Sequence, residues 1–134
     1  MNTSNLEALV AKITNALPQV KAVYVFGSVA KGLVRGESDL DLAILTKEKI
    51  ETVKLWLLAQ ELSTMVGCDV DLLDLRAASA VMRMQVIGQG RRLFCADLGM
   101  CEGFEDFVFS DYARLNEERA AILADMQDNG AVYG

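Results

Sequence analysis

The chain has 134 residues, a net charge of −6 at pH 7, a pI near 4.6 and no histidine. We expect a single domain over residues 1–134, without the clustered basic side chains that grip a nucleic-acid backbone; the missing histidine also excludes Ser–His and Cys–His catalysis. Neither a membrane span of about 18 apolar residues nor a secretion signal is evident, so a cytoplasmic protein with reduced thiols at Cys68, Cys95 and Cys101 is expected.

The chain begins with the signals of a helix followed by a strand. Ser4-Asn5-Leu6-Glu7 has the form of a capping box and predicts a helix from about residue 5 to 16, which Pro18 ends. Residues 20–26 are rich in Val, Tyr and Phe and predict a strand that stops at Gly27.

The middle of the chain predicts a loop, a strand and a long helix. Residues 28–38 carry two glycines and predict a short turn or helix and then a loop, and residues 40–45 predict a second strand. A helix is predicted over 47–66, with Gly67 as its left-handed C-cap. Its expected apolar arc comprises Ile50, Val53, Leu57, Leu58, Leu62 and Met65.

The last part of the chain adds two strands and two helices. A third strand is predicted over 68–75, then a helix capped by Ser79 that ends near residue 88 or 90, and an edge strand over 91–94. A final helix is predicted over about 102–127, with a frayed tail beyond it. This order of elements indicates a small α/β domain (α+β), with a mixed sheet of about four strands flanked by helices.

Carboxylates alternate along two of the predicted strands. Asp39 and Asp41 are two residues apart and therefore share one strand face, about 6.6–6.8 Å apart, and Asp69 and Asp71 do the same on the third strand. If the two strands are neighbours, the carboxylates converge into a set of oxygen ligands that suits Mg²⁺. The alternative is an acidic strand face that is simply solvated.

A Gly-Ser pair precedes the first aspartates and favours the metal-site interpretation. Gly27 and Ser28 lie where a strand gives way to a turn, and ten residues separate Ser28 from Asp39. Backbone N–H groups and a hydroxyl can hold an anion there, and glycine permits close approach of a phosphate. The stretch is not a P-loop, because Gly32 is followed by Leu33-Val34.

These motifs resemble the signature of the nucleotidyltransferase superfamily that includes DNA polymerase β: Gly27-Ser28, then Asp39-Leu40-Asp41, then a strand aspartate in Val70-Asp71-Leu72. The short chain and the stretches DVDLLDLRAAS and IGQGRRLFC are most similar to the MNT-domain antitoxins, minimal nucleotidyltransferases encoded beside HEPN-domain ribonuclease toxins. The resemblance covers about residues 20–95. One departure is Val29, which stands where relatives often carry Arg.

The resemblance implies a minimal nucleotidyltransferase fold and a specific activity, the transfer of AMP from ATP to a tyrosine hydroxyl of the toxin. It implies that Gly27 and Ser28 hold the triphosphate, with Lys31 or Arg35 supplying the missing cation. Asp39 and Asp41 would coordinate Mg²⁺, and Asp71 would complete a second metal site and help to deprotonate the hydroxyl. Asp69 is the alternative to Asp71.

Two other functions are compatible with the sequence. One is an inactive antitoxin that blocks the toxin by stoichiometric binding alone, which the intact aspartates disfavour. The other is transfer to a small molecule such as an aminoglycoside, for which the chain has no evident second domain.

The last helix carries an aromatic cluster that predicts either core packing or a docking surface. Phe104, Phe107, Val108 and Tyr112 share one side of this helix and could pack on the sheet. Phe109 lies about 100° away from Val108 and is a candidate contact with the toxin. We expect Phe107→Glu to lower both stability and binding, and Phe109→Glu to lower binding alone.

Overall fold

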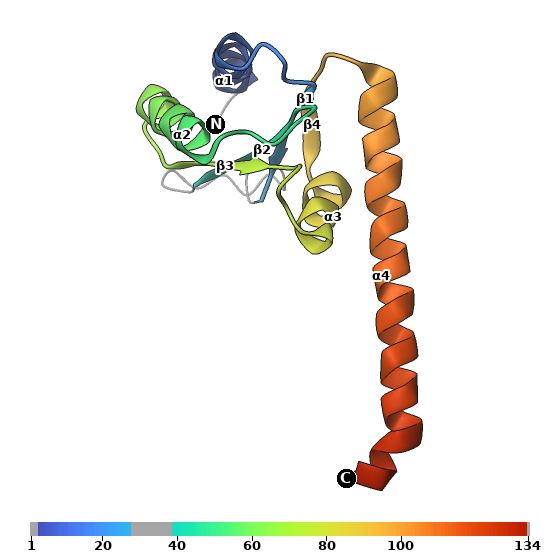
Figure 1. Ribbon diagram of the computed structural model, residues 1–134. Coiled ribbons are helices and arrows are strands. Elements are labelled where there is room, and N and C mark those ends of the chain that lie inside the picture. The colour runs from blue at the N-terminus through green and yellow to red at the C-terminus, as the bar shows by residue number, and fades with distance from the viewer. Residues whose placement is uncertain (1–2, 28–38, 134) are drawn as a thin grey trace.

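The computed structural model describes residues 3–27 and 39–133. In this part of the chain four strands form a mixed sheet, and four helices pack on its two faces (Figure 1). The sheet has the strand order β3-β2-β1-β4, formed by Val70–Asp74, Leu40–Leu45, Ala22–Phe26 and Arg91–Cys95. β1 pairs antiparallel with β2 and β4, whereas β2 and β3 are parallel. The predicted fold class is confirmed, and β4 is an edge strand as predicted.

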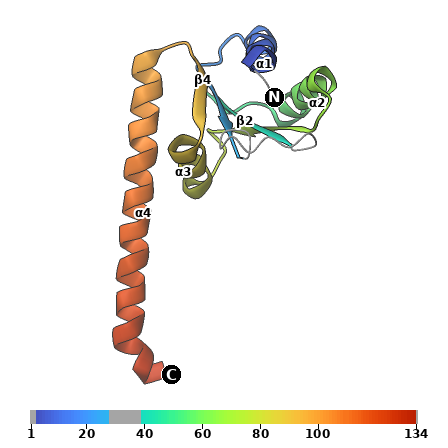
Figure 2. The same ribbon diagram turned by 180° about the vertical axis from the view of Figure 1, so that it is seen from behind.

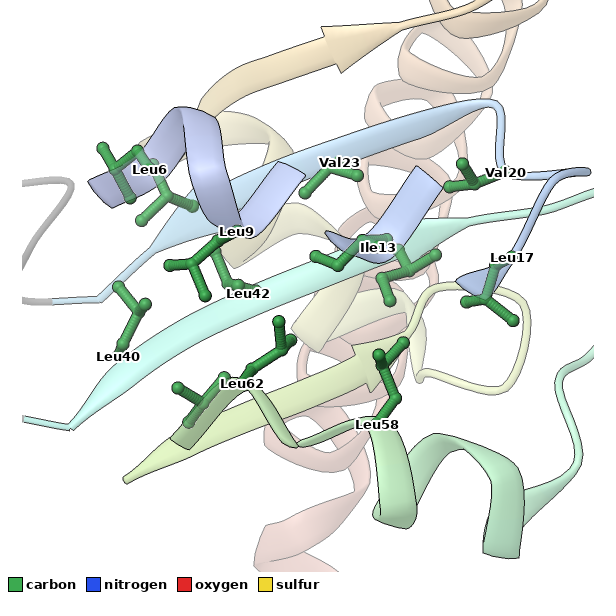
Figure 3. Close-up of a cluster of buried hydrophobic side chains, with 13 residues drawn as sticks. Leu6, Leu9, Ile13, Leu17, Val20, Val23, Leu40, Leu42, Leu58 and Leu62 are labelled. Carbon is green, nitrogen blue, oxygen red and sulfur yellow. The ribbon is translucent and has the colours of Figure 1, made fainter. Parts of the chain in front are cut away.

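One face of the sheet packs on the first two helices, α1 (Thr3–Ala16) and α2 (Thr52–Val66). Alternate residues of the central strands point into this core, because successive side chains of a strand face opposite ways. Leu40, Leu42 and Ile44 are fully buried there. Figure 3 shows leucines and isoleucine of α1 meeting those of β2 and α2.

The other face of the sheet packs on α3 (Ala80–Gln89) and on the first part of α4 (Leu98–Tyr133). Tyr24 contributes to this second core, and its hydroxyl donates a hydrogen bond to Glu105 Oε2 at 2.8 Å. Arg92 Nη1 of β4 lies 2.6 Å from the same oxygen. Glu105 therefore ties α4 to two strands of the sheet.

The predicted helix ends are confirmed at two positions. Gly67 is left-handed, with φ of 73°, and closes α2 through a hydrogen bond from its N–H to the Ser63 carbonyl. Ser79 caps α3, because its Oγ accepts a hydrogen bond from the Met82 N–H at 3.1 Å.

Other predicted boundaries are wrong, for physical reasons visible in the structure. α1 begins at Thr3, so Ser4 lies within the helix instead of capping it. α2 begins at Thr52 and not at residue 47, because Asp74 Oδ2 accepts a hydrogen bond from the Ile50 N–H and holds the preceding segment as a loop. α4 begins at Leu98, where Asp97 Oδ1 accepts from the Met100 N–H, and it continues to Tyr133 instead of fraying.

The predicted apolar arc of α2 is only partly correct. Leu58 and Leu62 are buried, whereas Val53, Leu57 and Met65 are exposed. The helix contacts the sheet through a narrower side than its sequence suggests. Within the described part of the chain, no helix is long and apolar enough to cross a membrane.

Candidate active site

Two predicted site residues are neighbours across the parallel strands. Asp41 of β2 and Asp71 of β3 are register partners, and adjacent strands lie about 4.8 Å apart. The expectation that these two strands are neighbours is confirmed. Asp39 is exposed and lies just before β2, on the same side as Asp41 by the two-residue repeat of a strand.

The register also separates the two aspartates of the third strand. Asp71 lies opposite Asp41, whereas Asp69 precedes β3 and its carbonyl accepts a hydrogen bond from the Leu40 N–H at 2.9 Å. The geometry brings Asp71 to the other carboxylates, and Asp69 contributes its backbone to the start of β2.

The grouped carboxylates repel one another. Burial raises the pKa of Asp41 above its ordinary value, and the neighbouring charges of Asp71 and Asp39 raise it further. A site that gathers like charges in a partly buried position is most stable when a cation offsets them. This arrangement is typical of functional carboxylate clusters.

Gly27 brings the end of β1 against Asp41. Phe26, the last residue of β1, pairs with Asp41, and Gly27 then turns the chain with φ of 74°. A Cβ atom at Gly27 would collide with Asp41 Oδ2. Only glycine fits here, because the position needs both a left-handed backbone and free space beside the carboxylate.

The donor set fits Mg²⁺. This ion prefers oxygen ligands and usually takes one or two carboxylates, completing its shell with water and substrate phosphates. Among residues 3–27 and 39–133, no group of three or more His, Cys, Asp or Glu side chains is placed to hold a metal ion, so the fit rests on the pair Asp41 and Asp71. The carboxylates at Asp41 and Asp71 leave coordination positions for a nucleotide. Ser28, Lys31 and Arg35 fall outside the described residues.

A pocket on the α2 side of β3 was not predicted from the sequence; Asp71 is part of its lining and Asp41 is not. It has a volume of about 300 Å³, lies between α2 and β3, and is lined by Trp56, Ala59, Leu72 and Asp71, among others. Trp56 is the single tryptophan of the chain and is exposed. The sequence carried one signal for this exposure. Trp56 lies on a different side of α2 from Leu58 and Leu62, which pack on the sheet.

The aromatic cluster of the last helix is split between core and surface. Phe104 and Val108 are buried against the sheet, which confirms core packing for this part. Phe107 is half exposed, with the Arg83 guanidinium 6.0 Å from its ring centroid. The premise that Phe107 is a core residue is therefore wrong. Phe109 is exposed, and its role in docking stays a prediction.

A mixed sheet that presents carboxylates on neighbouring strands beside a glycine turn defines a nucleotidyltransferase, and residues 9–98 match the family described as Polymerase beta, Nucleotidyltransferase. The chain belongs to this family, which confirms the resemblance inferred from the sequence.

The chain is 34% identical to the protein adenylyltransferase MntA of Shewanella oneidensis over 131 residues, which covers 98% of this chain and 94% of MntA. It is also similar to the MNT antitoxin solved in complex with the tri-AMPylated HEPN toxin of S. oneidensis, with a TM-score of 0.79, 32% identity, and coverage of 95% of this chain and 99% of that chain. A toxin–antitoxin structure with AMP-PNP gives a TM-score of 0.79 and 34% identity, with the same two coverages.

Proposed function

We propose that this chain is a protein adenylyltransferase and antitoxin, which transfers AMP from ATP to a tyrosine hydroxyl of a HEPN-domain ribonuclease toxin and so neutralises it. The observation that carries the proposal is the Asp41–Asp71 pair beside Gly27, on a fold shared over nearly its full length with an adenylyltransferase. The acidic net charge agrees with a protein acceptor, since such a substrate requires no basic groove.

The residues have distinct roles in this reaction. Asp39 and Asp41 would hold Mg²⁺, with Asp71 completing the site of a second ion. The ions would neutralise charge on the triphosphate and on the leaving diphosphate. Gly27 leaves space for the phosphates next to Asp41, and Ser28 with Lys31 or Arg35 would contact them. Asp71 lies on β3, which is an edge strand of the sheet, so an acceptor can approach it from outside the sheet.

The chemistry is a single displacement at the α-phosphorus of ATP. The tyrosine oxygen forms a bond to this phosphorus, the bond to the bridging oxygen of the β-phosphate breaks, and diphosphate leaves. The hydroxyl proton passes to Asp71, which acts as the general base. Only the carboxylate form of Asp71 can accept this proton.

The cytoplasm is the compartment in which this reaction has its substrates. ATP, Mg²⁺ and a ribonuclease target are all present there, and thiols stay reduced. Cys95 Sγ and Cys101 Sγ lie 3.2 Å apart as free thiols, which is compatible with a reducing compartment.

The decisive experiment measures the intact mass of the toxin. A HEPN-domain toxin is incubated with this chain, ATP and Mg²⁺, and mass increments of one AMP residue are expected, with loss of ribonuclease activity. EDTA and the Asp41→Asn variant serve as controls, and both should leave the toxin unmodified and active.

The competing function is inhibition by binding alone. The long exposed part of α4 could support it, because this surface is available without any chemistry. Inhibition of the ribonuclease without any gain in toxin mass, and undiminished by EDTA, would establish that function and exclude the adenylyltransferase.

A further inference from the structure

The apolar side of α4 continues beyond the part of the helix that packs on the sheet. Cys101, Phe104 and Val108 are buried against the sheet. The same side of the helix carries four further residues, which we call the distal stripe: Tyr112, Leu115, Ile122 and Met126. Met126 lies five full turns after Val108 and therefore points the same way, since a helix has about 3.6 residues per turn.

The distal stripe lies where the rest of the domain ends. In both views α4 runs well past α3 and past the sheet, so its C-terminal half projects away from the other elements (Figures 1 and 2). Ile122 is 61% exposed and Met126 is 60% exposed, with Leu123 beside them also exposed. An apolar side that is buried in the first half of one helix is thus open in the second half.

Charged residues border this stripe on one side. Arg114 pairs with Asp111 and with Glu118, each at 2.7 Å, along the flank of the helix. Arg119 is exposed and lies in the middle of the stripe, between Leu115 and Ile122. A matching surface would be an apolar groove with a carboxylate placed to meet Arg119.

We propose that the distal stripe is the surface on which the HEPN-domain toxin docks, an inference that rests on the proposed function. The relative solved in complex with its HEPN toxin matches 95% of this chain. Because α4 has 36 residues, most of this helix must be included in the match. β1 and α4 run in the same direction, so the free half of α4 lies beyond the end of the sheet that carries Gly27 (Figure 1). A toxin held there would lie on the side of the domain to which the carboxylate end of the sheet is directed.

A second copy of this chain is a less suitable occupant. Residues 111–127 contain four carboxylates, at Asp111, Glu117, Glu118 and Asp125, against two arginines. Two such helices side by side would bring like charges together, and each chain as a whole carries a net charge of −6.

The test compares two glutamates on opposite sides of the same helix turn. Ile122→Glu places a charge in the stripe, whereas Ala124→Glu places the same charge about 160° away around the helix. Both positions are exposed, so both variants should keep the melting temperature of the parent chain. We expect Ile122→Glu to weaken toxin binding about tenfold or more, and Ala124→Glu to change it less than about twofold.

Binding to a HEPN-domain toxin is measured by calorimetry without ATP, using the full chain. Light scattering of this chain alone gives its oligomeric state. Unchanged binding by Ile122→Glu would overturn the proposal, as would a dimer of the parent chain that Ile122→Glu converts to monomer. Because no transfer is needed, a chain that binds through the stripe but never modifies the toxin would refute the proposed function and leave the docking surface established.

Discussion

Asp41 and Asp71 lie directly opposite each other in the parallel register of β2 and β3. Burial and the charge of Asp71 both raise the pKa of Asp41, so the pair is held together by the strands against its own repulsion. A divalent cation between the strands would convert this repulsion into attraction. The proposed metal site would therefore depend on the pairing of β2 with β3.

Removing either charge should abolish transfer without unfolding the protein. We expect Asp41→Asn and Asp71→Asn each to slow AMP transfer about 100-fold or more, because charge stabilisation at the reacting phosphate is lost. Without metal, the melting temperature of Asp41→Asn should equal or exceed that of the parent, since a repulsion is removed. Mg²⁺ with ATP should raise the melting temperature of the parent and not of the variant.

Asp69→Asn is the matched control for these variants, because it makes the same change just outside β3. It should retain transfer. If Asp69→Asn were inactive and Asp71→Asn active, the assignment of the third carboxylate would be wrong.

The two left-handed glycines should differ in what they tolerate. Gly67→Ala meets no atom within 4 Å, so it should cost only the strain of a left-handed alanine, about 1 kcal/mol. Gly27→Ala adds a collision with Asp41 and should cost about 2–4 kcal/mol in the free energy of unfolding. Urea unfolding of the two variants measures the difference.

The same pair of variants tests the phosphate site. Gly27→Ala should weaken ATP binding, because Asp41 is displaced and the space beside it is filled. Gly67→Ala should bind ATP as the parent does. Equal ATP affinity in both variants would place the nucleotide elsewhere.

Tyr24 and Glu105 should stabilise the attachment of α4 to the sheet. Tyr24→Phe removes a hydrogen bond to a carboxylate and should cost about 1.5–3 kcal/mol of unfolding free energy. A double-mutant cycle with Glu105→Gln should give a coupling energy of about 0.5–3 kcal/mol. Tyr112→Phe, further along α4, is the control and should change stability by less than about 0.5 kcal/mol. A coupling energy near zero would show that this hydrogen bond does not hold α4 in place.

Adjacent leucines of α2 should respond very differently to truncation. Leu57 is 51% exposed and Leu58 is 4% exposed. Leu57→Ala should change the free energy of unfolding by less than about 0.5 kcal/mol, whereas Leu58→Ala should cost about 2–5 kcal/mol through lost burial and a cavity. Similar losses at both positions, measured by urea unfolding, would support the wider apolar arc that the sequence predicts.

Local patterns predicted much of the fold from the sequence. The bounds of β2, the Ser79 cap and the left-handed Gly67 all depend on residues within a few positions of each other. The start of α2 was missed because it depends on Asp74, which lies far along the chain and binds the Ile50 N–H. The exposure of Leu57 was missed because periodicity does not reveal how much of an apolar arc finds a partner.

The candidate site was likewise predictable where it depends on local sequence patterns, and not where it depends on tertiary contacts. The two-residue repeat of a strand placed Asp39 and Asp41 on one side without knowledge of the fold. The register of Asp41 with Asp71 requires the strand order, which is a tertiary property. The collision between a Cβ atom at position 27 and Asp41 likewise depends on the pairing of β1 with β2.

The mixed sheet also dictates when the site can exist during synthesis. Gly27 and Asp41 belong to the antiparallel pair β1–β2, which is close in sequence and can form early. Asp71 arrives only through the crossover that includes α2, and β4 then closes the other edge. A nascent chain that ends before β3 (Val70–Asp74) thus carries Asp39 and Asp41 but lacks the third carboxylate of the proposed site. The three carboxylates can therefore come together only after β3 has paired with β2, before α3 and α4 need to enclose the second core.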